Sequence, residues 1–334
     1  MSSYKNHKIS VVIPCYKVSE QIEAVIQDLP TWIWRVYVID DNCPQKSGKF
    51  VEKNFNDDRI KVLYNTVNLG VGGAVIAGYR EAIEAGADVI VKVDGDGQMD
   101  LSKLSLFVDP IVMSKCDYTK GNRFFDLSGI NQMPKIRIFG NIALSFITKF
   151  SSGYWSIFDP TNGYTAIDAS VAARLPLDRV SKRYFFESDL LYHLGLARAV
   201  VRDIPIPARY GDEESSLKIS KIFLEFPYKH FRNFLRRIMI QYFLRDFSIA
   251  SLELILGFLF LGFGLSFGIS HWIWSSSADQ VSTPGTVMLA ALPIILGIQF
   301  LLGFLNFDIN AQPSDPLKEK ISGLQELEIE VTSD

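Results

Sequence analysis

Residues 89–98 read VIVKVDGDGQ, an apolar run that ends in two carboxylates one glycine apart. The run predicts a buried strand, and the glycines predict a turn directly after it. Because glycine has no Cβ, the backbone at Gly95 and Gly97 can turn sharply and approach a ligand closely. Asp94 and Asp96 would then offer the oxygen ligands that Mg²⁺ or Mn²⁺ prefers, and a bound cation could hold a diphosphate.

Two other kinds of turn compete with a metal site here. A calcium loop of the EF-hand type needs glycine at its sixth position and glutamate at its twelfth. Counted from Asp94, those positions hold Met99 and Ser105, which excludes the calcium loop. An ordinary acidic turn at a strand end would explain the ten residues equally well. The choice between a metal site and an ordinary acidic turn therefore depends on the rest of the chain.

The first 125 residues alternate short β-rich runs with helical segments, which predicts an α/β fold with a mostly parallel sheet. The expected strands are residues 9–13, 36–39, 60–64, 89–93 and 118–120, with a further one at 199–204. The expected helices are residues 19–29, 49–55, 73–85 and 101–114, followed by one that begins near residue 136 and another near residues 185–189.

Polar and glycine residues follow four of these strands, at the edge where open parallel sheets bind ligands. They are residues 14–16, residues 40–41, residues 65–73 and residues 94–98. A lone acidic turn would not explain this clustering, so it favours a ligand site. The loop at 68–73, NLGVGG, could offer backbone N–H groups to phosphate or could only pack a helix against the sheet. The loop does not match the dinucleotide-binding fingerprint, because Val75 occupies the position of the last required glycine.

Two uncharged segments near the C-terminus predict transmembrane helices, with buried core helices as the alternative. Residues 254–274 and 286–305 contain no Asp, Glu, Lys or Arg, and each has the about 20 residues that cross a hydrocarbon core of about 30 Å. Pro293 would kink the second span. Residues 271–285 contain no Lys or Arg, whereas residues 218–245 contain seven. The positive-inside rule therefore predicts that both termini and the active site are cytoplasmic.

The segment just before the first span also points to the membrane. Residues 217–247 place apolar side chains at helical spacing among basic ones, which is typical of a helix at the membrane surface, although a core-facing helix would look similar. Small residues in the first span would let helices pack closely, within one chain or in a homo-oligomer. They are Gly257, Gly262, Gly264 and Gly268.

The composition of the chain restricts the cellular compartment and the kinds of binding partner that can be expected. Residues 1–8 are polar, so no N-terminal signal peptide is expected. Cys15, Cys43 and Cys116 lack metal-ligand spacing and are expected to be free thiols in a reducing compartment. A net charge of −3 argues against nucleic acid as a partner.

In combination and in this order, five motifs resemble the family 2 glycosyltransferases of the GT-A fold. They are residues 11–16 (VVIPCY), 40–41 (DD), 68–73 (NLGVGG), 94–98 (DGDGQ) and 121–123 (GNR). With the loop 159–164 (DPTNGY) and the two spans, the chain is similar to the polyprenyl-phosphate glycosyltransferases, the group that contains dolichol-phosphate mannose synthase. The expected domains are a Rossmann-like GT-A domain at 1–216, a basic amphipathic juxtamembrane helix at 217–247, two transmembrane helices at 248–309 and a cytoplasmic tail at 310–334.

The resemblance implies a UDP- or GDP-linked sugar as donor, a polyprenyl phosphate as acceptor, and Mg²⁺ or Mn²⁺ as cofactor. The implied donor-binding residues are Pro14, Tyr16, Asp40, Asp41, Gly70, Gly72 and Asp94, of which Asp40 is expected to lie beside the nucleotide pocket. The implied metal ligands are Asp94, Asp96 and Gln98. The implied catalytic residues are Asp94, Asp96, Arg123 and Asp159, and the implied acceptor-binding residues are Arg123, Asn162, Gly163 and Arg209. Some bacterial relatives carry an Asp where this chain has Tyr164, so the role of that Asp cannot be transferred.

The acceptor decides which groups an inverting, in-line transfer needs. A phosphate monoester has a second pKa of about 6, so it is largely dianionic at neutral pH and needs little help from a base. A lipid or saccharide hydroxyl would need a carboxylate base, for which Glu187 and Asp189 are the candidates. The membrane segments favour the lipid phosphate. A non-catalytic membrane scaffold is a further alternative, and the absence of a Gln-x-x-Arg-Trp motif disfavours a processive synthase.

Overall fold

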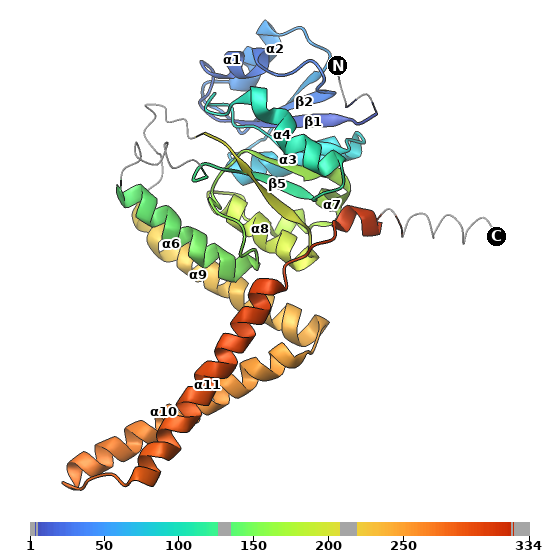
Figure 1. Cartoon of the computed structure of the whole chain (residues 1–334). Coiled ribbons are helices and arrows are strands. Elements are labelled where there is room, and N and C mark those ends of the chain that lie inside the picture. The colour runs from blue at the N-terminus through green and yellow to red at the C-terminus, as the bar shows by residue number, and fades with distance from the viewer. Residues whose placement is uncertain (1–3, 5, 126–134, 208–218, 322, 324–334) are drawn as a thin grey trace. The chain divides into compact units, whose positions relative to one another are not determined.

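The computed structural model describes residues 4, 6–125, 135–207, 219–321 and 323. The chain forms two compact units, of which the first comprises Met1–Phe234 with Pro313–Asp334 and the second comprises Leu235–Gln312. Figure 1 traces the chain by colour from the N-terminus to the C-terminus. Arg209 and the rest of the run at 208–218 lie outside the described residues.

A seven-stranded sheet forms the centre of the first unit (Figure 1), in the order β3-β2-β1-β4-β6-β5-β7. The strands are β1 (Ile9–Cys15), β2 (Arg35–Asp40), β3 (Ile60–Tyr64), β4 (Val89–Lys92), β5 (Tyr118–Asn122), β6 (Thr165–Asp168) and β7 (Val201–Pro205). The strand pairs are parallel except where β6 pairs with β4 and β5. The predicted mostly parallel α/β fold is confirmed.

Strand β6 is the part of the sheet that the sequence does not reveal. Its four residues are too few for a clear alternating pattern, and all four are buried. The strand runs antiparallel between β4 and β5, where Thr165 lies opposite both Lys92 and Lys120. Pairing on both edges, and not its own composition, explains why it is a strand. Its position brings the preceding loop, 159–164, to the ends of β4 and β5.

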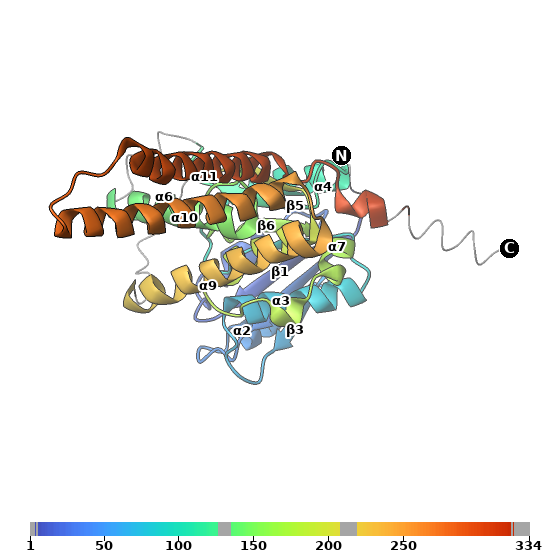
Figure 2. The ribbon, with the colours of Figure 1, turned by 90° about the horizontal axis from the view of Figure 1, so that it is seen from below.

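Helices cover both faces of the sheet (Figures 1 and 2) and bury a separate apolar core on each. One core includes Tyr79 of α3 and Leu190 of α8, and the other includes Val25 of α1 and Phe107 of α4. The helices are α1 (Ile22–Gln27), α2 (Ser47–Asn54), α3 (Val71–Glu84), α4 (Leu104–Val112), α6 (Lys135–Ser152), α7 (Ala169–Arg174) and α8 (Phe186–Ala197). Short 3₁₀ turns lie at Leu101–Lys103 and Leu177–Arg179.

The strand order reverses between β1 and β4. Strands β1, β2 and β3 follow one another toward one edge, and β4 then pairs with the other side of β1. The loops after β1 and β4 therefore lead away from each other and leave a crevice at the carboxyl ends of the two strands. Residues 16–18 and 94–98 belong to these two loops, so the topology itself places the DGDGQ turn at the ligand-binding edge.

Helix α9 (Ile219–Met239) contains the first part of the predicted amphipathic segment, and a π-helical turn (Ile240–Arg245) follows it. Within the first unit, α9 packs through buried polar contacts. His230 Nδ1 lies 2.8 Å from Ser151 Oγ of α6, and Asn233 donates to Asp189 Oδ1 of α8 at 2.8 Å. Phe226 packs edge-on against Phe185 at the start of α8. These contacts attach α9 to the sheet domain.

His230 should make the stability of the first unit depend on pH. Burial lowers its pKa to about 4, below the value of 6.5 expected in the unfolded chain. Between these two pH values His230 binds a proton in the unfolded state but not in the folded state. The contribution of His230 to the free energy of unfolding is therefore fully present above pH 6.5 and is lost as the pH falls toward 4. The shift corresponds to about 3 kcal/mol. We expect His230→Gln to lose about that much of the acid dependence, measured by denaturant unfolding of the detergent-solubilised protein at several pH values.

Ser151→Ala is the matched control, because it removes the partner of His230 and leaves the titrating ring in place. It should lower stability at every pH and keep the slope. If His230→Gln and the wild type lost the same free energy of unfolding between pH 6.5 and 4, His230 would not be the group responsible.

The second unit is a hairpin of two long helices, α10 (Ile249–Ser277) and α11 (Pro284–Asn310). By length and composition, both are candidate membrane spans. They pack closely through small residues, since a Cβ on Gly257 would lie 2.7 Å from Leu301 and one on Gly264 would lie 2.9 Å from the carbonyl oxygen of Ala290. Gly268 also faces Ala290, whereas a Cβ on Gly262 would meet open space among the described residues. Three of the four glycines that were candidates for contacts between chains therefore pack against the other helix of the same hairpin.

Candidate active site

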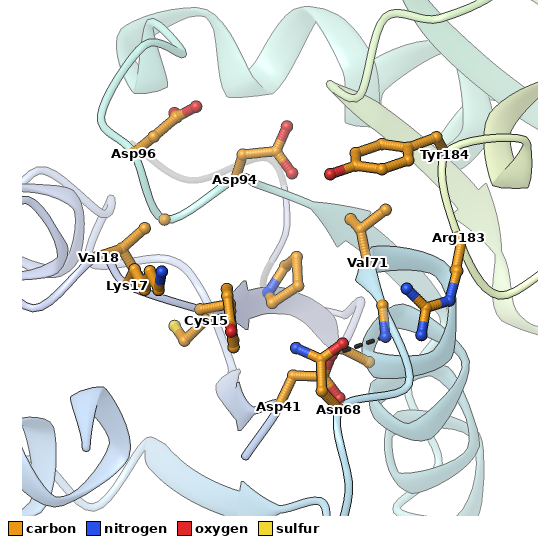
Figure 3. Close-up of a pocket in the computed structure, with 15 residues that line it drawn as sticks. Cys15, Lys17, Val18, Asp41, Asn68, Val71, Asp94, Asp96, Arg183 and Tyr184 are labelled. Carbon is orange, nitrogen blue, oxygen red and sulfur yellow. Dashed lines mark hydrogen bonds between the residues drawn. The ribbon is translucent and has the colours of Figure 1, made fainter. Parts of the chain in front are cut away.

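A cavity of about 700 Å³ opens at the carboxyl ends of β1 and β4. Its volume is in the range of about 300–1,000 Å³ that is usual for small-molecule sites. Figure 3 shows that Lys17 and Val18 lie on one side, Arg183 and Tyr184 on the other, and Asp94 and Asp96 along the rim between them. The lining residues are 14–18, Asp41, Asn68, Gly70, Val71, Ala74, 94–96, Arg183 and Tyr184. Pro14, Tyr16, Asp41, Gly70 and Asp94, predicted from the sequence to bind the donor, are therefore together.

Asp41 organises one wall of this cavity. Its carboxylate accepts hydrogen bonds from Asn65 Nδ2 (2.7 Å), from the backbone N–H of Leu69 (2.9 Å) and from that of Gly70 (2.7 Å). Gly70 has φ +85°, and a Cβ there would lie 2.8 Å from the carbonyl oxygen of Lys182. Only glycine fits this backbone without strain. The glycine loop is therefore shaped by a carboxylate and by a close approach of the chain near Arg183.

Asp40 and Gly72 lie behind the cavity wall and do not line it. Asp40 is buried, and its two oxygens accept from the backbone N–H of Cys43 (2.7 Å), in the loop before α2, and from that of Gly48 (2.8 Å), in the first turn of α2. A Cβ on Gly72 would lie 2.6 Å from the ring of Phe186. Gly72 therefore allows the loop to pack closely against Phe186, which is the packing role expected as one of the two alternatives for the loop at 68–73. Asp40 lies beside the pocket, as the resemblance implies, but neither Asp40 nor Gly72 lines the cavity in which both were expected to bind the donor.

Asp94, Asp96 and Gln98 form an oxygen-rich turn at the mouth of two cavities. Asp94 and Asp96 line both cavities, and Gln98 lines the second. The turn closes on itself, because the N–H of Gln98 donates to Asp96 Oδ1 at 3.0 Å. Among the described residues no cluster of three or more His, Cys, Asp or Glu could enclose a metal. Two carboxylates and an amide suit a hard cation that keeps water and ligand phosphates in its coordination shell, as Mg²⁺ does.

The second cavity, of about 150 Å³, lies between the DGDGQ turn and the loop 159–164. Its lining includes Arg123, Thr161, Asn162, Gly163 and Tyr164. The predicted acceptor residues within the described part of the chain thus come together beside Asp94 and Asp96. Tyr164 is buried, and its ring stacks on Phe107 with centroids 4.0 Å apart. At that position this chain has a packing residue in place of a carboxylate.

Arg123 and Asp159 form a two-bond ion pair at the edge of the second cavity. Arg123 Nε donates to Asp159 Oδ2 at 2.7 Å, and Arg123 Nη2 donates to Oδ1 at 2.8 Å. Burial alone would raise the pKa of Asp159, but the hydrogen bonds and the charge of Arg123 outweigh it and hold that pKa below its usual value. Asp159 is fully buried and is not among the lining residues, whereas Arg123 is. Asp159 therefore holds the guanidinium in a fixed orientation.

Glu187 and Asp189, the base candidates for a hydroxyl acceptor, line neither cavity. Asp189 accepts from Asn233 and from the backbone N–H of Ser181 at 2.8 Å, so both of its oxygens are used in packing. Glu187 is buried beside Lys92, and burial raises its pKa although the charge of Lys92 lowers it. Neither carboxylate is placed to take a proton from an acceptor in these cavities.

Arg183, Tyr184 and Lys92 are among the residues of this region that the sequence does not mark as functional. Arg183 and Tyr184 reach the first cavity from the segment before α8, about 90 residues from the DGDGQ turn along the chain. Lys92 lies beneath the turn in β4. An arginine next to a tyrosine in a loop carries no pattern that marks it as functional. A lysine in an otherwise apolar buried strand is a recognisable signal, because such a charge needs partners.

Comparison with known proteins identifies the family and the fold. Residues 10–175 match the model of glycosyl transferase family 2. The UDP-N-acetylglucosamine–dolichyl-phosphate N-acetylglucosaminyltransferase of Methanococcus voltae is 26% identical over 218 residues, which cover 61% of this chain and 86% of that protein. The undecaprenyl-phosphate mannosyltransferase of Micrococcus luteus is 28% identical over 211 residues, covering 62% and 85%.

Among solved structures, the fold is similar to that of glucosyl-3-phosphoglycerate synthase from Mycobacterium tuberculosis in complex with Mn²⁺, UDP and glucosyl-3-phosphoglycerate. The TM-score is 0.53 at 15% identity, over 70% of this chain and 81% of that one. This likeness concerns the fold alone. With the family match and the named relatives, it confirms the GT-A fold and the class of enzyme. Residues 10–175 of this chain are a glycosyl transferase family 2 domain, and the protein is a glycosyltransferase.

Proposed function

We propose that the protein transfers a sugar from a nucleotide-sugar donor to a polyprenyl phosphate at the cytoplasmic face of a membrane. One observation carries the proposal: Asp94 and Asp96 line both a large cavity and a smaller one that contains Arg123. A donor diphosphate held at these carboxylates would have its sugar beside an acceptor phosphate held at Arg123. The relatives named above act on dolichyl and undecaprenyl phosphates, which supports the choice of acceptor.

The first cavity would hold the nucleotide. Pro14, Tyr16 and Asp41 would border the nucleoside, and Gly70 would let the backbone come close to it. Arg183 reaches the same cavity from the opposite wall and brings a positive charge toward the diphosphate. Asp94, Asp96 and Gln98 would hold Mg²⁺ or Mn²⁺, which when bound neutralises charge on the leaving diphosphate.

The second cavity would orient the acceptor. Arg123, fixed by Asp159, would bind one phosphate oxygen and leave another directed at the anomeric carbon. A new bond then forms between that oxygen and the anomeric carbon, while the bond from this carbon to the nucleoside diphosphate breaks and the diphosphate takes the electron pair. A dianionic phosphate needs no general base. The absence of Glu187 and Asp189 from the lining of both cavities fits this route.

The surface of the first unit supports work at a membrane. Helix α6 exposes Phe139, Ile142 and Phe146, and α9, which contacts α6 through His230 and Ser151, exposes Tyr228 and Phe231. Aromatic and aliphatic side chains on two adjacent helices suit the boundary between head groups and acyl chains. The candidate spans α10 and α11 follow α9 in the chain. The distribution of Lys and Arg around the spans predicts that the active site is cytoplasmic.

The proposal can be tested with the purified full-length protein in lipid nanodiscs. Undecaprenyl and dolichyl phosphates are each supplied with Mn²⁺ and a panel of labelled UDP- and GDP-sugars, selected by the rise in melting temperature that each donor causes. We expect one donor to give a labelled glycolipid from which mild acid releases the labelled sugar, because the bond between an anomeric carbon and a phosphate is acid-labile. A product stable to mild acid would indicate a hydroxyl acceptor. Donor binding without any transfer to lipid across the panel would favour the scaffold alternative.

A further inference from the structure

Lys92 is a buried cation directly beneath the DGDGQ turn. It ends strand β4, whose four residues are all buried, and only 1% of its side chain is exposed. Removing an ammonium group from water is costly unless several acceptors replace the water. The identity and position of these acceptors therefore indicate what the lysine is for.

The ammonium group has three acceptors on three different parts of the site. Lys92 Nζ donates to Asp94 Oδ1 at 2.7 Å and to the carbonyl oxygen of Gly163 at 3.1 Å, and it lies 3.4 Å from Glu187 Oε1. An ammonium group has three N–H donors, so this set can use all of them. Asp94 belongs to the donor side, Gly163 to the acceptor-side loop, and Glu187 to the first turn of α8, just after Arg183 and Tyr184.

The distances show which contact is the main one. The shortest goes to Asp94, whose side chain is 28% exposed, and the longer one goes to Glu187, whose side chain is 11% exposed. A lysine present only to neutralise a buried glutamate would have its shortest contact with that glutamate. Glu187 is placed instead to balance a cation whose closest partner is Asp94.

Gly163 closes the other side of the same group. A Cβ on Gly163 would collide with Lys92 Nζ and would lie 2.5 Å from Asp94 Oδ2. The ammonium thus holds the Asp94 carboxylate at Oδ1, and Gly163 leaves room for Oδ2 beside the loop backbone. A movement of the acceptor-side loop would therefore displace the lysine and the carboxylate together.

The structure assigns Lys92 the role of a positioning residue that fixes the Asp94 carboxylate for the donor's cation and joins it to the acceptor-side loop at Gly163. This role rests on the proposed function, because it presumes that Asp94 binds the cation of the donor diphosphate. Lys92 itself touches no substrate. Its effect is to keep the two cavities in one fixed arrangement.

The test uses variants that separate positioning from folding. Lys92→Met alone would leave Asp94 and Glu187 close together without the cation, so it is combined with Glu187→Gln to remove both buried charges. Replacing a buried ion pair by residues of similar volume is often tolerated by the fold. Gly163→Ala disturbs the same contacts and leaves every charge in place, and Lys92→Arg keeps the cation. Tyr37→Phe, in the core on the same sheet, outside both cavities and away from Lys92 and Glu187, is the matched control.

Mn²⁺ affinity is measured first, by electron paramagnetic resonance with UDP and with GDP and without acceptor. We expect the double variant and Gly163→Ala to bind Mn²⁺ about 10- to 100-fold more weakly. We expect kcat for glycolipid formation to fall about 100-fold, as a small displacement of a site residue can cause. Lys92→Arg should recover part of both losses, and Tyr37→Phe should match the wild type.

The double variant overturns the assignment if it folds and stays within threefold of the wild type in both Mn²⁺ affinity and kcat. If the double variant does not fold, the same criterion is applied to Gly163→Ala: Mn²⁺ affinity and kcat both within threefold of the wild type would overturn the assignment. A wild-type protein that binds Mn²⁺ with a nucleotide but glycosylates no polyprenyl phosphate would contradict the proposed function, while the comparison of Mn²⁺ affinities would still judge the role of Lys92.

Discussion

Asp96→Asn is expected to lower kcat for glycolipid formation about 1,000-fold, equivalent to about 4 kcal/mol of activation free energy. Asn has nearly the same shape as Asp but carries no charge and binds Mg²⁺ or Mn²⁺ far less well. Without the cation, the charge that develops on the leaving diphosphate would lose its main stabilisation. Asp96 is half-buried in a turn at the cavity mouth, so the fold should survive the change. Steady-state kinetics over a range of Mn²⁺ concentrations measures the effect.

A matched carboxylate elsewhere separates this effect from a general loss of charge. Asp178 is 86% exposed, pairs with Arg80 and lines neither cavity. Asp178→Asn should leave kcat and the dependence on Mn²⁺ unchanged. Activity of Asp96→Asn within tenfold of the wild type at every Mn²⁺ concentration would exclude Asp96 as a ligand of a catalytic cation.

Arg123→Ala is expected to lower kcat/KM for the polyprenyl phosphate about 100-fold, since a charged hydrogen bond contributes up to about 3 kcal/mol. Arg123→Lys should recover only part of the loss, because an ammonium cannot reproduce the planar two-bond contact with Asp159 while it also binds phosphate. Steady-state kinetics with increasing concentrations of polyprenyl phosphate in nanodiscs measures kcat/KM for the acceptor.

Donor binding is the internal control for Arg123. Arg123 lines the second cavity and does not line the first, so the affinity for the nucleotide sugar should stay within threefold of the wild type. A variant that lost donor and acceptor affinity equally would place Arg123 at the diphosphate instead. Asp159→Asn should resemble Arg123→Lys in its acceptor kinetics, because it removes the charge that orients the guanidinium.

Much of the sheet and the centre of the site could be predicted from the sequence because their signals are local. Apolar runs such as residues 9–13 and 36–39 mark strands by their own composition. Asp94, Asp96 and Gln98 lie within five consecutive residues, so any fold that ends β4 there brings them together. The two candidate spans are equally local, since length and the absence of charge suffice to recognise them.

Other parts of the site depend on contacts between distant residues. Strand β6 has only four residues and exists because β4 and β5 pair with it from both sides. Arg183 and Tyr184 become part of the first cavity only when α8 packs against α3, where Gly72 meets Phe186. Asp40 and Asp41 are adjacent in sequence, yet only Asp41 lines the cavity, because successive side chains of an extended segment point in opposite directions.

The sequence by itself determined the α/β class, the strand that ends in the DGDGQ turn, the oxygen-bearing side chains of that turn and the two apolar helices. These features follow from residues that are neighbours in the chain. Only the tertiary structure decided that Asp94 and Asp96 border two cavities, that Asp159 holds Arg123, and that Lys92 joins Asp94 to Gly163 and Glu187. The physical reason is that burial removes water from charged groups, and the partners that replace the water come from segments far apart in the sequence.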